Sequence, residues 1–102
     1  MEDDEYEFGA PLDADEAATV NALTPEDISA IDEALLGATS PSWSKVAMVL
    51  AKQMKARPGI PDDVPLEFYW SRLCKMVASG ELASQGNLRR ARFSEVRRAT
   101  VR

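Results

Sequence analysis

The sequence contains no histidine and a single cysteine. Without histidine, the chain lacks the commonest general base and metal ligand of proteins. Cys74 has no partner for an internal disulfide, and one cysteine without histidine cannot build a zinc site of the usual kinds. We therefore expect no bound metal and no cofactor, and the composition argues against an enzyme. Cys74 is expected to be a small core residue.

Long hydrophobic runs are also missing. The chain has no stretch of about 18 apolar residues, so we expect no membrane-spanning helix. Its first ten residues, MEDDEYEFGA, lack the basic and apolar regions of a secretory signal, which leads us to expect a cytoplasmic protein. A chain of 102 residues has room for one domain with a modest core.

Basic residues are absent from the first part of the chain. Residues 1–40 hold 12 of the 17 acids and no Lys or Arg, whereas residues 41–102 hold all 12 Lys and Arg with the other 5 acids. The two parts therefore carry net charges of −12 and +7, which sum to the −5 of the whole chain. Opposite charges on the two parts predict that they attract different partners.

Residues 1–22 have few large apolar side chains, and these follow no helical or strand period. Such a segment cannot bury enough surface to offset its ordering entropy, so we predict an acidic disordered arm. One interpretation makes the arm a solubilising tail. The other makes it fold back on the basic end and mask that end until a partner displaces it.

A first helix is predicted over residues 25–36. Thr24 can cap it, Pro25 suits the first helical position, and apolar residues recur behind them at helical spacing. Gly37 is expected to end this helix in a left-handed conformation.

Two further helices are predicted downstream. A helix over 43–56 has Ser40 or Ser42 as its cap and an apolar stripe made of Trp43, Val46, Ala47, Leu50, Ala51 and Met54. A third helix begins near Val64-Pro65 and ends at Gly80.

A hairpin is predicted behind the helices. Residues 81–85 and 88–96 have strand character, and Gly86-Asn87 between them is a candidate two-residue turn. The fold class is therefore mainly α with a C-terminal β-hairpin. Three helices followed by a hairpin is the order of a winged helix-turn-helix domain, so we expect a winged-helix-like domain over 23–98, with three helices plus a wing, and a frayed basic tail over 99–102.

Several motifs resemble a bacterial family of unknown function. They are Trp43-Ser44-Lys45-Val46-Ala47, Phe68-Tyr69 with Arg72, Gly80-Glu81-Leu82, and above all Gly86-Asn87-Leu88-Arg89-Arg90 with Ser94-Glu95-Val96-Arg97. The resemblance covers about residues 23–98. In that family the domain often forms the C-terminal end of longer uncharacterised proteins, and the resemblance implies no established activity. This chain differs in having only the acidic arm upstream, which suggests a stand-alone role.

Arginine is concentrated in the predicted hairpin and just behind it, as Arg89, Arg90, Arg92, Arg97 and Arg98. Alternation along the second strand would place Ala91 and Phe93 on one face and Arg90 and Arg92 on the other. Arginines on a wing can pair with phosphates or with carboxylates of a partner protein. The alternative is an ordinary solvated strand face.

Glu95 is the only acid in this basic stretch. It shares a strand face with Phe93, where it can pair with Arg72 or Arg89. We therefore expect a structural role for Glu95 ahead of a contact with an external partner.

Three consecutive aromatic residues, Phe68-Tyr69-Trp70, cannot all face inward on a helix, because successive residues turn by about 100°. At least one should be exposed, and an exposed aromatic beside arginines is the usual make-up of a binding hot spot. The predicted contact residues are Tyr69, Trp70, Arg72, Arg89, Arg90, Arg92, Arg97 and Arg98.

Two functions remain open. The first is a non-enzymatic protein-binding module such as an immunity protein, antitoxin or regulatory subunit, favoured because the acidic arm repels DNA. The second is a winged-helix DNA-binding transcriptional regulator. Its recognition helix would carry only Arg72 and Lys75 as bases, with the acid Glu67, which is little for reading base edges. A protein partner is thus preferred to nucleic acid, and the oligomeric state stays open.

Overall fold

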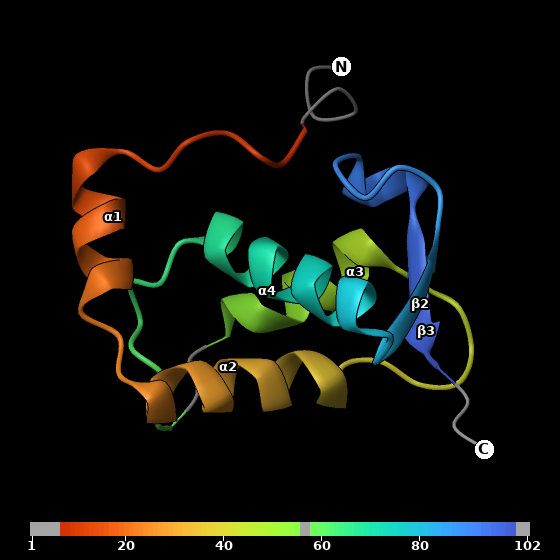
Figure 1. The fold of residues 1–102 in the computed structure, drawn as a ribbon, viewed down its shortest axis with the longest axis horizontal. Coiled ribbons are helices and arrows are strands. Elements are labelled where there is room, and N and C mark those ends of the chain that lie inside the picture. Colours follow the sequence, from red (N-terminus) through yellow and green to blue (C-terminus); the bar gives the residue numbers. More distant parts are fainter. Residues whose placement is uncertain (1–6, 56–57, 100–102) are drawn as a thin grey trace.

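The computed structural model describes residues 7–55 and 58–99. Figure 1 shows α2 along one side, α4 through the centre, and a small sheet at the end opposite α1. The helices are α1 (Ala14–Asn21), α2 (Pro25–Gly37), α3 (Val46–Ala51) and α4 (Leu66–Ser79), with short 3-10 turns η2 (Lys52–Met54) and η3 (Ala91–Phe93). The strands are β1 (Ser44–Lys45), β2 (Leu82–Gln85) and β3 (Glu95–Arg98).

Helix α2 begins as its sequence predicts. The Thr24 hydroxyl accepts a hydrogen bond from the Asp27 amide, and the Asp27 carboxylate accepts one from the Thr24 amide, both at 3.0 Å. This reciprocal capping satisfies two backbone donors at the helix start. The predicted end is wrong, because Gly37 stays helical and the cap is Ala38 in right-handed conformation.

Helix α4 confirms the predicted third helix. Pro65 precedes its first residue, and Gly80 ends it with φ of 90°, a value that favours glycine. The Glu81 amide then donates to the Met76 carbonyl at 2.9 Å, which satisfies one of the last carbonyls of the helix.

The predicted helix over 43–56 is wrong at its start. Ser44 and Lys45 form β1, and the helix begins only at Val46, without a side-chain cap from Ser40 or Ser42. Strand pairing is the reason: β1 is antiparallel to β3, and the Val46 amide donates to the Ser94 carbonyl at 3.0 Å. The far end of the expected apolar stripe also fails, because Met54 is 75% exposed.

The sheet has the order β1-β3-β2, with both neighbours antiparallel to β3. Val96 lies in the central strand opposite Ser44 on one side and Ser84 on the other, and its side chain is fully buried. A hairpin of β2 and β3 therefore exists, and β1 adds a third strand that the sequence did not predict.

The connection between β2 and β3 differs from the predicted tight turn. Residues 86–94 form a longer loop that contains η3, so Arg90 and Arg92 are not strand residues. Gly86 has φ of 85°, and a Cβ there would meet the Phe93 carbonyl oxygen at 2.7 Å, which requires glycine.

This loop, residues 86–94, is closed by its own backbone. The Arg90 carbonyl accepts from the Phe93 amide at 2.9 Å and from the Ser94 hydroxyl at 3.0 Å. As a result Ala91 is buried while Phe93 is 54% exposed, so these two residues do not share a face as predicted.

The core lies between α2, α3, α4 and the sheet. Its fully buried large side chains come from every one of these elements: Ile31, Leu35, Val46, Val49, Leu50, Leu73, Leu82 and Val96. Helix α1 contributes no buried residue.

The prediction of a disordered arm over 1–22 is contradicted for residues 7–22, and residues 1–6 lie outside the described part of the chain. Asp13 caps α1 through the Glu16 amide, and the Glu16 carboxylate accepts from the Asp13 amide in return. Phe8 is buried against the domain. Local capping thus orders a segment whose lack of apolar residues argued for disorder.

At the other end, the predicted frayed tail over 99–102 is described only at Ala99, whose amide donates to the Glu81 carbonyl at 3.1 Å. The described residues together form a compact α/β domain with four α-helices and a small three-stranded antiparallel sheet.

Candidate functional site

Arg72 is engaged inside the domain. Its Nε donates to Asp32 Oδ1 at 3.0 Å and its Nη2 to Asp32 Oδ2 at 2.7 Å, a two-pronged ion pair between α4 and α2. The hydrogen bonds that Arg72 donates to the Asp32 carboxylate raise the pKa of the Arg72 guanidinium. This predicted contact residue therefore joins two helices, and its charge is already matched.

Arg98 also serves the fold. Its Nη2 donates to the Leu36 carbonyl at 2.7 Å, and its Nε donates to the Thr39 hydroxyl at 3.3 Å. Leu36 lies in the last turn of α2, where carbonyls lack helical partners and the helix dipole favours a cation. The guanidinium of Arg98 thus supplies hydrogen-bond donors at the end of α2, where the sequence predicted a glycine stop.

Glu95 has a partner other than the two predicted for it. Its carboxylate accepts a hydrogen bond from the Gln85 side chain, the residue paired with it across β2 and β3. Arg89 instead lies 3.7 Å from the Glu7 carboxylate, in a half-exposed ion pair.

The aromatic triplet presents no exposed side chain, contrary to expectation. Tyr69 is buried, and Phe68 and Trp70 are half-buried. The Trp70 indole donates from Nε1 to the Leu88 carbonyl at 2.9 Å, and the Phe8 ring covers it at a centroid distance of 5.8 Å. A residue far away in the sequence therefore covers the surface that helical geometry alone left open.

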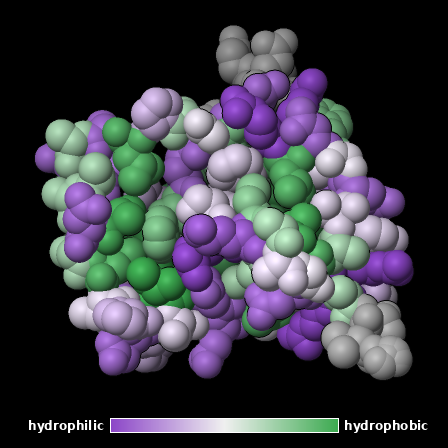
Figure 2. Space-filling view, in the orientation of Figure 1, coloured by the Kyte–Doolittle hydropathy of each residue, from purple (hydrophilic) through white to green (hydrophobic). Residues whose placement is uncertain are grey.

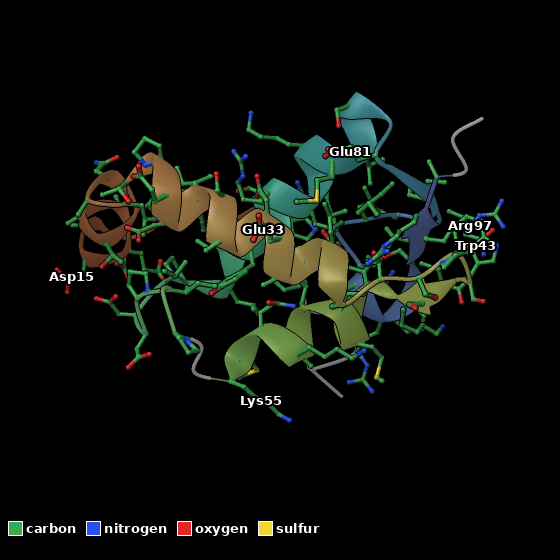
Figure 3. All side chains as sticks on the ribbon, turned by 90° about the horizontal axis from the view of Figure 1, so that it is seen from below. Asp15, Glu33, Trp43, Lys55, Glu81 and Arg97 are labelled. Carbon is green, nitrogen blue, oxygen red and sulfur yellow. The ribbon has the colours of Figure 1, made fainter. Side chains whose placement is uncertain are left out.

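Aromatic rings stacked with arginines occur instead at the edge of the sheet and on η3. Trp43 precedes β1, and the Arg97 guanidinium lies over its ring, with Cζ 4.5 Å from the ring centroid. Figure 3 shows the two side chains together at one end of the molecule. A second pair of this kind is formed by Arg90, whose Cζ lies 5.0 Å from the centroid of the Phe93 ring.

Strand register explains how Trp43 and Arg97 meet. Val96 and Ser44 pair on the core side, so the alternating residues on both strands face outward. We call this outward side the outer sheet face, formed by Trp43, Lys45, Ala83, Gln85, Glu95 and Arg97. Among these, Lys45, Gln85 and Arg97 are exposed.

Exposed apolar side chains also lie on two elements near β1, namely η3 and α3. Phe93 on η3 is 54% exposed and Met48 on α3 is 58% exposed, and both β1 and α3 pack against η3. Arg92 is exposed on η3 between Ala91 and Phe93. Three of the predicted arginines, Arg90, Arg92 and Arg97, thus lie around exposed apolar side chains.

A cavity of about 300 Å³ lies elsewhere, between η2, the segment after it, and the start of α4. It is lined by Gln53, Met54, Lys55, Ile60, Pro61, Asp62, Val64, Leu66 and Tyr69. The Gln53 amide donates to the Val49 carbonyl at 3.0 Å, while Gln53 Oε1 is buried without a hydrogen-bond partner. Paired carboxylates suited to acid–base chemistry are not among these lining residues.

Within residues 7–55 and 58–99, no three His, Cys, Asp or Glu side chains cluster as metal ligands would. None of the helices in these ranges is long and apolar enough to cross a membrane. Cys74 is half-buried on α4, and its burial raises the pKa of the thiol. A raised pKa makes a thiol less reactive, because the thiolate is the nucleophile.

No protein-family model matches the chain, and neither a curated protein nor a solved structure shows significant similarity to it. The resemblance to a bacterial family of unknown function therefore stays a prediction.

Proposed function

We propose that this chain is a cytoplasmic, non-enzymatic protein-binding module, and that its partner docks on the outer sheet face and the adjoining η3. The observation that carries the proposal is the half-exposed Phe93 ring beside Arg90, on a 3-10 turn that packs against β1, the strand that follows Trp43 of the Trp43–Arg97 pair. Immunity proteins, antitoxins and regulatory subunits are the classes of protein that fit such a module.

The composition of this surface supports a protein partner. Trp and Arg are the residues most enriched at binding hot spots, and an exposed Met adapts readily to the shape of a partner. Stacking on Trp43 and Phe93 holds Arg97 and Arg90 in defined positions before binding, which lowers the entropy lost on association. A partner that fits offers an apolar recess ringed by carboxylates.

The test places a photo-crosslinking amino acid at Phe93 and, as a control, at Ser29, an exposed position on α2. We expect a discrete protein adduct in cells from position 93 and none from position 29. The affinity of that partner for the purified protein should fall at least about 10-fold with Phe93→Ala, as for a hot-spot residue. An unchanged affinity would refute the proposed surface.

A winged-helix DNA-binding regulator is the second candidate. The order α2, α3, α4, β2, β3 agrees with three helices plus a wing, and residues 86–94 would form that wing. However, α4 exposes only Lys75, Ala78 and Ser79, which is little surface for a recognition helix. We therefore rank DNA binding second.

Electrophoretic mobility shifts with a random duplex separate the two candidates. They are run at low and at moderate salt, with the full chain and with a chain that lacks residues 1–22. Tight binding by the shorter chain that weakens steeply with salt would be the counterion-release signature of DNA binding. We expect neither chain to show it.

A further inference from the structure

The segment over residues 7–13, here called the N-terminal strap, runs from the start of α1 across α4 to the loop over residues 86–94 (Figure 1). Among residues 7–22, only the Phe8 side chain is buried, with 6% of its surface exposed. A single aromatic anchor therefore holds an otherwise superficial segment.

Phe8 occupies a socket built by α4 and the loop. Its ring stacks on Trp70 with an interplanar angle of 14°. The hydrogen bond from Trp70 Nε1 to the Leu88 carbonyl fixes the orientation of the indole. We call the set Glu67, Trp70, Leu88 and Arg89 the Phe8 socket.

Polar contacts flank the ring on both sides. The Phe8 amide donates to the Arg89 carbonyl at 2.8 Å, and the Gly9 amide donates to Glu67 Oε1 at 2.9 Å. The Glu7 carboxylate lies 3.7 Å from the Arg89 guanidinium. Hydrophilic side chains surround this meeting point of the strap and the loop in Figure 2.

Gly9 adds a conformational requirement. Its φ is 109°, a value that favours glycine after the aromatic residue. A Cβ there would lie 2.8 Å from Nη1 of Arg89, whose half-exposed guanidinium can move aside. The strap thus places an acid, a phenylalanine and a glycine, in that order, against the socket.

Apart from Phe8, the strap and α1 bury no side chain completely. Residues 9–11 are exposed, and α1, which follows the strap, buries no side chain and is capped by its own Asp13 and Glu16. Segments with few buried contacts open at low free energy without unfolding the rest of the domain. The Phe8 socket can therefore empty while the core stays folded.

We propose that the Phe8 socket is a peptide-recognition site for acid–Phe–Gly segments, with the chain's own strap as its resident occupant. A partner protein that carries an exposed segment of the same chemistry replaces the strap and frees Glu7. This site is separate from the outer sheet face, so the inference does not depend on the proposed function. Tethering gives the strap a high effective concentration, which limits exchange to partners with matching chemistry.

The test uses the full chain with Phe8→Ala and a fluorescent synthetic peptide that corresponds to residues 2–12. Fluorescence anisotropy should show that this variant binds the peptide at least about 10-fold more tightly than the wild-type chain, whose socket is occupied in cis. Replacing Phe by Ala, or Gly by Ala, in the peptide should remove binding.

Met54→Ala is the matched control, because it truncates an exposed apolar side chain on η2, outside both the socket and the outer sheet face, and should leave peptide binding at the wild-type level. The socket and the outer sheet face are tested at different residues, Phe8 and Phe93, so failure of this inference is distinguishable from failure of the proposed function. A second variant, Glu7→Arg, weakens the strap through its surface ion pair with Arg89 and leaves the Phe8 ring in place. It should bind the peptide between the two extremes.

Two results would overturn the inference. One is a folded Phe8→Ala variant that binds the peptide no better than the wild-type chain does. The other is loss of the helical circular dichroism signal in Phe8→Ala, combined with wild-type peptide binding by Glu7→Arg, because Phe8 would then be permanent core.

Discussion

Residues 7–22 and residues 82–98 both pack against α4, yet they attach to it by different means. The first segment buries one side chain, Phe8, and its helix is held by local capping. The second buries Leu82 and Val96 fully and is tied together by a strand ladder. Charge alone suggested two opposite halves, whereas burial distinguishes a segment held by one buried side chain from a sheet that belongs to the core.

The acidic and basic parts also have distant regions in the folded molecule. Figure 3 places Asp15 of α1 at one end of the molecule and the Trp43–Arg97 pair at the other. Between them, Asp32 and Arg72 bring one acid and one base from the two parts into an internal ion pair. The acidic and basic parts therefore meet both in this ion pair and in the core, where Ile31 and Leu35 of α2 are buried.

The largest expected effect comes from truncating the sheet. Leu82→Ala removes a fully packed side chain of β2 and should lower the free energy of unfolding by about 3 kcal/mol. The same change in the strap, Leu12→Ala, should cost less than about 1 kcal/mol, because Leu12 is only half-buried. Urea unfolding of both variants checks this, and equal losses would abolish the distinction between the two regions.

The next effect concerns the acid that connects the two parts. Asp32→Ala leaves Arg72 without its carboxylate while its side chain is 24% exposed, so we expect a loss of about 1–2 kcal/mol. Glu33→Ala, which truncates an exposed acid on the same helix, is the control and should be near neutral. Thermal unfolding of the two variants would sharpen the comparison, and a neutral Asp32→Ala would show that the ion pair contributes nothing.

Phe8→Ala should act locally. Although Phe8 is as buried as a core residue, its loss releases the strap and leaves α2, α3, α4 and the sheet in place, so we expect a global loss of about 1 kcal/mol or less. Hydrogen exchange should accelerate at the Phe8 and Gly9 amides and stay slow at Val96. A loss as large as that of Leu82→Ala would place the strap in the permanent core.

The smallest effect is a pH dependence at Cys74. Burial raises the pKa of the folded thiol, so stability is complete below the ordinary thiol pKa and falls as the pH rises from there through the raised value. Cys74→Ala should remove this slope. Urea unfolding of the variant and the wild-type chain at pH values on both sides of the ordinary thiol pKa measures it, and identical slopes would contradict the prediction.

The helices that the sequence located best are those with local start and stop signals. Thr24 and Pro25 predict the start of α2, and Gly80 predicts the end of α4, because capping involves residues within one or two turns. The predicted helix is wrong at Ser44 and Lys45. The apolar helical period continues there, but these residues form a strand that pairs with β3. A local sequence pattern carries no information about a partner strand that lies far along the chain.

The candidate surfaces were found only in part. Clustering of arginine in the sequence drew attention to residues 89–98, but it could not separate Arg97, stacked on Trp43, from Arg98, which hydrogen-bonds the end of α2. Their neighbours come from residues more than 50 positions away. Strand alternation predicts that Phe93 shares a face with Ala91, and this is wrong because residues 91–93 form a 3-10 turn.

By itself, the sequence determined the charge division, the start of α2, the extent of α4 and the presence of a C-terminal hairpin, because each depends on composition or on neighbours along the chain. Tertiary structure alone decided that Phe8 fills a socket beside Trp70, that β1 completes the sheet, and which arginines remain at the surface. These outcomes depend on contacts between distant segments, whose free energy comes from shared burial and from hydrogen bonds that form only once the segments meet.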